Sequence, residues 1–173
     1  MFLLCSINAR GPGPRKQDFV KDFIQKSSVD ICCVQETLLS EPAPSSWWPG
    51  PGFWSPTMGR QGGVAILISD DFNGKVSHWR KDPDGRVLSI LIQCNSFAIN
   101  LVCIYAPATC LTDRKVFFES IHEYCFPSDA IIFAGDFNCY KYKLDKLGGN
   151  FAPAKYLSDF RKSLNLIDAW HES

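Results

Sequence analysis

Polar side chains of the types that bind metal ions and phosphates follow four apolar segments of this sequence. Each apolar run ends directly before such residues: Phe2–Ile7 before Asn8, Ile31–Val34 before Gln35 and Glu36, Leu101–Ile104 before Tyr105, and Ile131–Ala134 before Gly135, Asp136 and Asn138. Side chains just beyond buried strands stand on rigid supports and can converge on one rim of a fold. The pattern therefore predicts that these side chains gather at one end of the molecule.

The residue types together fit the hydrolysis of a phosphodiester. Glu36 offers the hard oxygen that Mg²⁺ prefers, and Asp136 can orient or deprotonate a water molecule or hold the metal. Asn8 and Asn138 can fix a phosphate or a carboxylate. Tyr105 can donate a hydrogen bond to a phosphate oxygen, or act as a general acid if its pKa were lowered.

Each of these residues also has an ordinary structural explanation. An Asp-x-Asn sequence after a strand is often turn chemistry, in which the side chains bond to the local backbone. Tyr105 and the Ala-Pro that follows it can simply mark the end of a strand, because proline ends strand pairing. Asn8 can cap the next turn. The four sites together are much harder to explain as turns, and this favours the chemical interpretation.

The elements that must position these residues alternate between apolar runs and amphipathic stretches. We expect buried strands, a hairpin and three helices, and we expect Glu41–Thr57 to form a long loop packed by its own aromatic residues. The expected strands are Phe2–Ile7, Asp30–Val34, Gly63–Ser69, the hairpin Val87–Gln93 with Phe97–Ile104, and Ala130–Ala134; the expected helices are Asp18–Lys26, one from Thr112 or Asp113 to about Cys125, and one with Pro153 in its first turn. This order predicts two sheets packed face to face with helices outside, and it leaves a three-layer α/β domain open.

Length and composition predict one soluble globular domain. The chain has 173 residues, of which 46% are hydrophobic and 21% charged, so a core of fair size can be buried. Eighteen basic and eighteen acidic residues give a formal charge of zero, so binding to nucleic acid would need a local patch of positive charge. The sequence has neither the pattern of a signal peptide nor an apolar run long enough to cross a membrane, which predicts a nuclear or cytoplasmic protein that is not secreted.

The eight cysteines are interpreted as reduced thiols. Most of them lie in or beside apolar runs, where a free cysteine behaves as a small hydrophobic residue. The sequence contains no C-x-x-C pair and only three histidines, which argues against a structural zinc site.

Six short motifs occur in the order typical of the endonuclease/exonuclease/phosphatase superfamily. They are S-I-N-A-R-G (Ser6–Gly11), V-Q-E-T (Val34–Thr37), G-G-V-A-I-L-I (Gly62–Ile68), D-G-R-V-L (Asp84–Leu88), I-Y-A-P (Ile104–Pro107) and A-G-D-F-N (Ala134–Asn138). Within this superfamily the chain most resembles the apurinic-type endonuclease domain of LINE-type (non-LTR) retrotransposons. The N-A-R-G opening, the D-G-R-V-L segment and the L-I-D-A-W segment (Leu166–Trp170) carry that closer resemblance.

The resemblance implies a fold, an activity and a set of roles. The fold would be an α/β (α+β) four-layer sandwich, with two packed mixed β-sheets flanked by helices. The activity would be Mg²⁺-dependent (or Mn²⁺-dependent) nicking of target DNA, in a longer relative fused to a reverse transcriptase. Glu36 would be the principal metal ligand with Asn8 beside it, Tyr105 would contact the scissile phosphate, and Asp136 and Asn138 would orient the attacking water.

The resemblance departs from the family at the last residues of the sequence. The family continues past L-x-D-x-W to an S-R-I-D segment and a D-H pair with a catalytic histidine, whereas this sequence ends at His171-Glu172-Ser173. We therefore expect residues 1–173 to form a single domain that lacks roughly the last quarter and is weak or inactive. His171 is interpreted as an exposed terminal residue, and His78, in a loop, and His122, on a helix, match no motif.

Two other functions stay open at this point. One is a phosphoesterase of the same superfamily that acts on a phosphoinositide or a sphingolipid. The other is a non-enzymatic relic of a retrotransposon. The retrotransposon-type segments favour DNA, and the absence of an amphipathic or polybasic membrane-binding stretch agrees with that choice.

Overall fold

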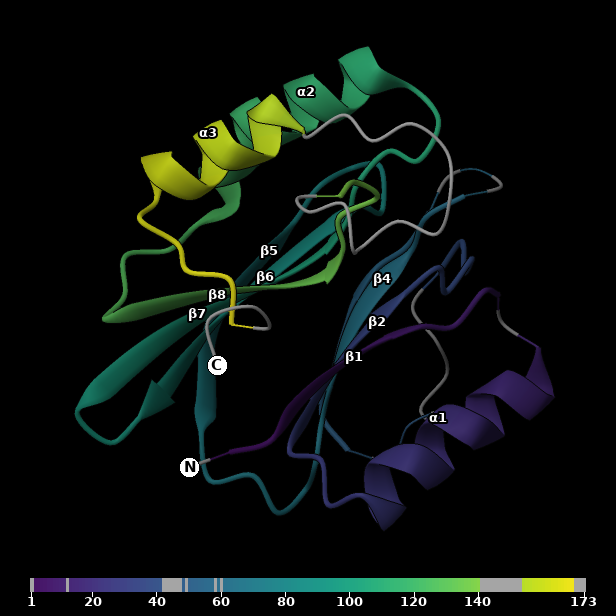
Figure 1. The fold of residues 1–173 in the computed structure, drawn as a ribbon. Helices are drawn as coiled ribbons and strands as arrows, with labels where there is room; N and C mark the ends of the chain where they lie inside the picture. The colour runs from purple at the N-terminus through teal and green to yellow at the C-terminus, as the bar shows by residue number, and fades with distance from the viewer. Residues whose placement is uncertain are drawn as a thin grey trace. The chain divides into compact units, whose positions relative to one another are not determined.

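The computed structural model in Figure 1 describes residues 2–11, 13–41, 48, 50–57, 59, 61–140 and 154–169. The chain divides into two compact units, which are Met1–Tyr105 with Tyr124–Asp136 and Ala106–Glu123 with Phe137–Ser173. The single domain expected from the sequence stays a prediction. In chain order the described elements are β1 (Leu4–Asn8), α1 (Pro14–Lys26), β2 (Ile31–Gln35), β3 (Gly52–Ser55), β4 (Val64–Ile68), β5 (Lys75–Lys81), β6 (Val87–Cys94), β7 (Phe97–Tyr105), α2 (Leu111–Ser120), the 3₁₀ helix η1 (Ile121–Tyr124), β8 (Ala130–Asp136) and α3 (Lys155–Ser163).

The first unit contains two four-stranded sheets, ordered β1-β2-β4-β3 and β5-β6-β7-β8. Each sheet is mixed, because β1 runs parallel to β2 and β7 runs parallel to β8, whereas the other neighbours are antiparallel. Parallel neighbours need a crossover, and α1 supplies the one between β1 and β2. This arrangement confirms the predicted α/β sandwich of two packed mixed sheets.

Two clusters of apolar side chains hold the first unit together. The cluster between the sheets joins Cys33 and Ile66 of the first sheet to Ile90 and Leu101 of the second, all almost inaccessible to solvent. The other cluster packs Val20 and Ile24 of α1, with other side chains, against the outer face of the first sheet. The central strands β2 and β4 are therefore covered on both faces, and this explains why their sequences are apolar without alternation.

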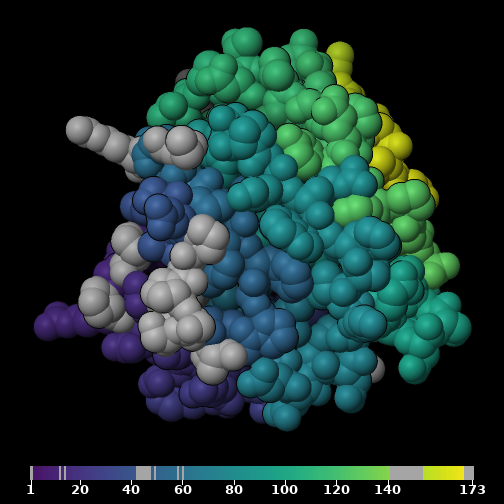
Figure 2. All heavy atoms as spheres, turned by 180° about the vertical axis from the view of Figure 1, so that it is seen from behind, coloured from purple at the N-terminus to yellow at the C-terminus, as the bar shows by residue number. Residues whose placement is uncertain are grey.

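The outer strands of the two sheets meet on the side of the first unit shown in Figure 2. The rings of Phe53 on β3 and Trp79 on β5 lie 6.1 Å apart between centroids. In the figure, the blue atoms of the β3–β4 region adjoin the teal atoms of the β5–β7 region. This contact closes one edge of the inter-sheet core.

Three sequence-based expectations about strands were wrong or incomplete, and all three concern sheet edges. The first strand was expected to be buried on both faces, but β1 is an edge strand that is only half-buried, with Ser6 exposed. The expected loop Glu41–Thr57 contains the edge strand β3. His78 was expected in a loop but lies on β5, an edge strand with six exposed residues. The edge strands β3 and β5 bury few side chains, so they lack the apolar signal by which the other strands were predicted.

The described α-helices lie where three helices were predicted, but their ends differ. Helix α1 begins at Pro14, four residues before the expected start, since proline suits a first helical turn. Helix α2 is capped by Cys110 and continues as η1, and Phe118 is its buried ring, whereas Phe117 is half-buried. Pro153, expected to open the last helix, lies outside the described residues. No described helix is long and apolar enough to cross a membrane.

Candidate active site

The side-chain amide of Asn8 joins two carboxylates at the ends of strands. Its Nδ2 donates to Oε1 of Glu36 at 2.9 Å and to Oδ2 of Asp136 at 3.2 Å. Asn8 ends β1 and Asp136 ends β8, while Glu36 follows β2 directly, so both sheets contribute to this cluster. In the first unit these three side chains lie together at one rim, as the sequence predicted.

Tyr105 is the fourth member of this cluster. It ends β7, lies opposite Asp136 in the strand register and is 4% exposed, and its hydroxyl donates to the Glu36 carboxylate. Burial, followed by the negative charges of Glu36 and Asp136, raises the pKa of Tyr105, and Arg86 opposes this rise. The phenol is therefore a hydrogen-bond donor at neutral pH. The alternative, a general acid with a lowered pKa, stays a prediction.

Gly135 lets β8 approach β7 closely enough to place Asp136. Its φ is +142°, and a Cβ at this position would lie 2.0 Å from the carbonyl oxygen of Ile104. No other residue fits this space without moving the backbone. The glycine of the A-G-D-F-N motif thus has a steric role directly beside the carboxylate.

The segment that carries Glu36 is held by the two glycines before β4. Glu36 has a left-handed backbone with φ +52°, which is uncommon for a residue with a side chain. The next two amides, of Thr37 and Leu38, donate to the carbonyls of Gly63 and Gly62 at 3.0 and 3.2 Å. A Cβ on Gly63 would lie 2.3 Å from Oγ1 of Thr37. The V-Q-E-T motif, together with the residue after it, is therefore hydrogen-bonded through the backbone to the start of the G-G-V-A-I-L-I motif.

Arg86 belongs to this environment, although it was not among the predicted site residues. Its Nη1 donates to the carbonyl of Tyr105 at 3.4 Å, and its Cζ lies 5.6 Å from the centroid of the Tyr105 ring. The turn before it is braced by the buried carboxylate of Asp82, whose Oδ1 accepts from the amides of Arg86 and Val87 at 2.8 Å each. The only sequence signal for Arg86 was its place in the D-G-R-V-L motif.

Asn138, the fifth predicted residue, is described within the second unit. It has a left-handed backbone with φ +48°, and its Nδ2 donates to the carbonyl of Ala106 at 2.8 Å. The next carbonyl, of Pro107, accepts from Nε of the buried Arg114 at 2.6 Å. Asn138 and Arg114 thus fix consecutive carbonyls of the same segment. A role of Asn138 in orienting water stays a prediction.

The first-unit cluster suits a hard divalent cation. Mg²⁺ takes oxygen ligands, usually one or two carboxylates with several water molecules. Among the residues that the structure describes, no group of three or more His, Cys, Asp or Glu side chains could hold a metal, so a cage of many protein ligands is not built there. Mg²⁺ needs only one or two carboxylates, and the cluster offers Glu36 and Asp136. Glu36 would hold the ion.

The orientation of Asn8 bears on its predicted role as a ligand. Its Nδ2 faces the two carboxylates, and its Oδ1 accepts from the amide of Arg10 at 3.1 Å. A nitrogen of this kind donates and does not bind a cation. Direct ligation by Asn8 would require the amide to turn over, so the observed bonds favour a positioning role.

The histidines of the described residues lie on other elements. His78 is on β5, with its ring 6.1 Å from that of Phe126. His122 is on η1 in the second unit. His171 lies outside the described residues.

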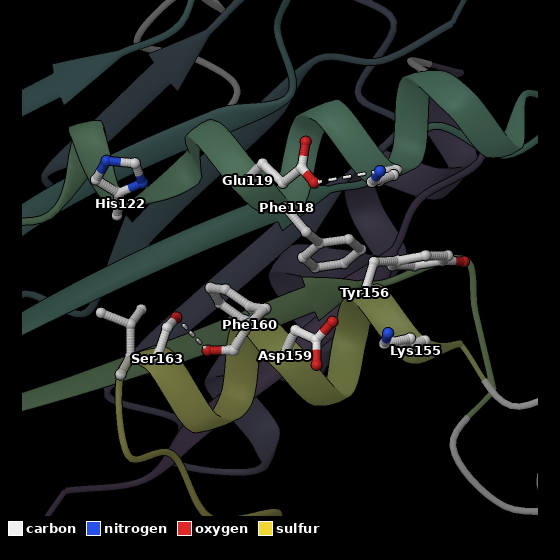
Figure 3. A pocket seen from close by; sticks show the side chains of 10 residues that line it. Phe118, Glu119, His122, Lys155, Tyr156, Asp159, Phe160 and Ser163 are labelled. Atoms are coloured by element: carbon white, nitrogen blue, oxygen red, sulfur yellow. Dashed lines mark hydrogen bonds and ion pairs between the residues drawn. The ribbon is translucent and has the colours of Figure 1, made fainter.

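The second unit has a groove between α2 and α3 with a volume of about 860 Å³. Figure 3 shows Phe118, Tyr156 and Phe160 between the two helices, with Glu119 of α2 and Asp159 of α3 also lining the groove. Phe118 packs against the other two rings, at 5.6 and 5.2 Å between centroids. None of the predicted site residues lines this groove. We interpret it as a consequence of aromatic packing between two helices.

The fold and this cluster agree with a match to a known family. Residues 5–150 match the Endonuclease/Exonuclease/phosphatase family, and the chain belongs to that family. The match includes Asn8, Glu36, Tyr105, Asp136 and Asn138.

One curated relative comes from a transposon. The chain is 28% identical over 181 residues to the transposon TX1 uncharacterized 149 kDa protein of Xenopus laevis. This alignment covers 98% of the chain but only 14% of the relative.

Solved structures of similar fold include DNA-processing enzymes. The AP endonuclease LMAP of Leishmania major matches 92% of this chain and 66% of its own with a TM-score of 0.72 at 18% identity. The endonuclease domain of TRAS1, a telomere-specific non-LTR retrotransposon, matches 95% of this chain and 71% of its own with a TM-score of 0.66 at 14% identity. The 3′ phosphatase NExo of Neisseria, bound to a product DNA hairpin, matches 84% and 61% with a TM-score of 0.63 at 16% identity. At these identities the likeness establishes the fold.

Proposed function

We propose that this chain is a Mg²⁺-dependent (or Mn²⁺-dependent) phosphodiesterase domain that nicks DNA. The observation that carries this proposal is the contact of one amide, that of Asn8, with the carboxylates of Glu36 and Asp136 at the ends of strands from both sheets. One neutral donor holds the two carboxylates together there, and a divalent cation would stabilise their negative charges.

The proposed mechanism divides the work among the four clustered side chains. When bound at Glu36, Mg²⁺ would neutralise the charge that develops on the phosphoryl oxygens. Asp136, fixed by Asn8, orients the attacking water and accepts its proton. Tyr105 stays protonated and donates a hydrogen bond, either to Glu36 or to a phosphate oxygen of the substrate. Asn138 is proposed to complete the orientation of the water.

DNA is the proposed substrate because of the named relatives. The transposon protein, the retrotransposon endonuclease domain and the enzyme bound to a DNA hairpin all point to nucleic acid. We propose target-site nicking within a larger retrotransposon protein, since the chain spans 14% of its transposon relative. No feature of the described residues favours a phosphoinositide or a sphingolipid over DNA.

A protein of these 173 residues is proposed to nick slowly. His78 is the single histidine of the first unit, and it lies on β5 beside Phe126 rather than among Asn8, Glu36, Tyr105 and Asp136. The described cluster thus contains no histidine to donate to the developing charge, and one such donor is typically worth about 10²–10³ in rate.

A supercoiled-plasmid nicking assay tests the proposal. Slow nicking should require Mg²⁺ and should be lost in Asp136→Asn, which keeps the shape of the side chain but removes its charge. Asp18→Asn, an exposed position on α1, is the matched control and should nick like the unchanged chain. Nicking that survives in Asp136→Asn, or in EDTA, would contradict the proposed mechanism.

A further inference from the structure

Arg86 is a basic residue beside Tyr105, the buried phenol of the carboxylate cluster in the first unit. It is half-buried, and its guanidinium lies beside the ring of Tyr105, where its positive charge acts against the negative charges of Glu36 and Asp136. A guanidinium has five N–H donors. Only the bond to the Tyr105 carbonyl, a long one at 3.4 Å, uses them toward another described residue.

The backbone at Arg86 is fixed from two directions. Its amide donates to the buried Asp82 carboxylate at 2.8 Å, and its carbonyl accepts from the amide of Tyr105 at 2.8 Å. Ser55 adds a third donor to the same Asp82 oxygen at 3.1 Å. The guanidinium is thus carried by a rigid turn next to Tyr105, which is the condition for a preorganised binding group.

A phosphodiester substrate would add negative charge to this cluster. Glu36 and Asp136 carry two negative charges, which one divalent cation would neutralise. A phosphodiester that enters this site brings a further negative charge and needs a positive partner. Arginine is suited to that task, because its planar fork matches the geometry of phosphate oxygens.

We propose that Arg86 binds a non-bridging phosphate oxygen of the substrate and so sets the balance between cation binding and phosphodiester binding. The inference rests on the proposed function and assigns a substrate-binding role to a residue outside the predicted catalytic set. Arg86 repels the cation and attracts the phosphate. Removal of its positive charge should therefore raise the affinity for the cation and lower the affinity for the phosphodiester.

Two binding measurements without turnover test this inference. The first is calorimetric titration of the chain with Mn²⁺ alone, and the second is the binding of a short fluorescein-labelled DNA duplex in EDTA. The variants are Arg86→Gln, Arg86→Lys and the control Lys81→Gln, which removes one positive charge from an exposed position of β5. Thermal melting of each variant reports whether it folds.

Arg86→Gln should bind Mn²⁺ about threefold to tenfold more tightly, because a nearby positive charge is gone. The same variant should bind the duplex roughly tenfold to a hundredfold more weakly, since a charge-assisted hydrogen bond to phosphate is lost. Arg86→Lys should recover most of the DNA affinity, and Lys81→Gln should leave Mn²⁺ binding unchanged.

Two results would overturn the inference. One is DNA affinity of Arg86→Gln equal to that of the unchanged chain. The other is a parallel loss of Mn²⁺ and DNA affinity with a lowered melting temperature, which would assign Arg86 a purely structural role. Failure of the unchanged chain to bind Mn²⁺ would instead count against the proposed function, and the DNA measurement in EDTA would still report on Arg86.

Discussion

The side-chain amide nitrogen of Asn8, Nδ2, lies 3.2 Å from Oδ2 of Asp136, although the two residues are 128 positions apart in the chain. The same nitrogen lies 2.9 Å from Glu36. One neutral donor therefore holds two like charges in place, and the site depends on the ends of three strands being correctly aligned.

Asn8→Ala should separate positioning from metal binding. The substitution removes the donor to both carboxylates but leaves Glu36 in place, so Mn²⁺ affinity should fall by less than about threefold, while nicking should fall roughly 10²-fold because the carboxylates are no longer aligned. Calorimetry and the plasmid assay measure the two quantities. A loss of Mn²⁺ binding as large as that in Glu36→Gln would show that Asn8 is itself a ligand.

Gly135→Ala should destabilise the chain by about 2–4 kcal/mol, because a Cβ cannot fit beside the Ile104 carbonyl and the backbone at φ +142° is unfavourable for alanine. Urea denaturation measures this change. Gly59→Ala is the matched control, since a Cβ there meets no atom within 4 Å, and it should change stability by less than about 0.5 kcal/mol. Equal stability of the two variants would argue against the close approach of β8 to β7.

The buried Asp82 should make stability depend on pH in a direction opposite to that of an ion-paired aspartate. Burial raises its pKa, and hydrogen bonds from Val87, Arg86 and Ser55 offset part of the rise. The folded state then holds this proton more tightly than the unfolded state, for which the value is about 3.9. The contribution of Asp82 to stability is thus full below that value and is lost as pH rises through the folded pKa.

Asp82→Asn isolates this effect, because an amide oxygen still accepts the backbone hydrogen bonds. The free energy of unfolding of the unchanged chain minus that of the variant should decrease as pH rises from about 3 to 7. Urea denaturation at several pH values measures the difference. An increase over the same range would mean that the hydrogen bonds outweigh burial and that the carboxylate prefers to be charged.

The cysteines at the centre of the first unit should resist alkylation. A hydrogen bond with Cys103, followed by burial, raises the pKa of Cys33, and a hydrogen bond with Cys5 and burial raise the pKa of Cys32. The thiolate is the reactive form, so both thiols should react with iodoacetamide far more slowly in the folded chain than in urea. Mass spectrometry of peptides after brief labelling measures this. Half-buried Cys110 serves as the comparison, and labelling of Cys33 as fast as Cys110 would refute the packing described for the core.

The sequence predicted the core of the site because its members follow apolar runs. The ends of β1, β2, β7 and β8 are visible as the points where apolar residues give way to Asn8, Glu36, Tyr105 and Asp136. The runs of β2 and β7 are continuous because these central strands are buried on both faces, whereas β1 and β8 are half-buried edge strands that nevertheless carry apolar runs. The identity of the side chains then limited the possible chemistry, and family resemblance supplied their roles.

What the sequence did not reveal depends on edges and on long-range contacts. Strand β5 is polar because it lies at a sheet edge, so it lacks a recognisable period. Arg86 reaches the site only because Asp82 braces its turn and because β6 pairs with β7 beside Tyr105. Neither relationship can be deduced from local composition. The left-handed backbone of Glu36 is likewise associated with the bonds that the next two amides, of Thr37 and Leu38, donate to the segment before β4.

The most direct test of the central claim is calorimetric titration of the chain with Mn²⁺, compared with the isosteric variant Glu36→Gln. Glu36→Gln keeps an oxygen that can accept from Asn8 and Tyr105 but removes the charge that would hold the ion. The account predicts binding by the unchanged chain that weakens at least about tenfold in Glu36→Gln and is unaltered in Glu41→Gln, an exposed glutamate later in the sequence. Binding that is absent from the unchanged chain, or equal in all three proteins, would contradict it.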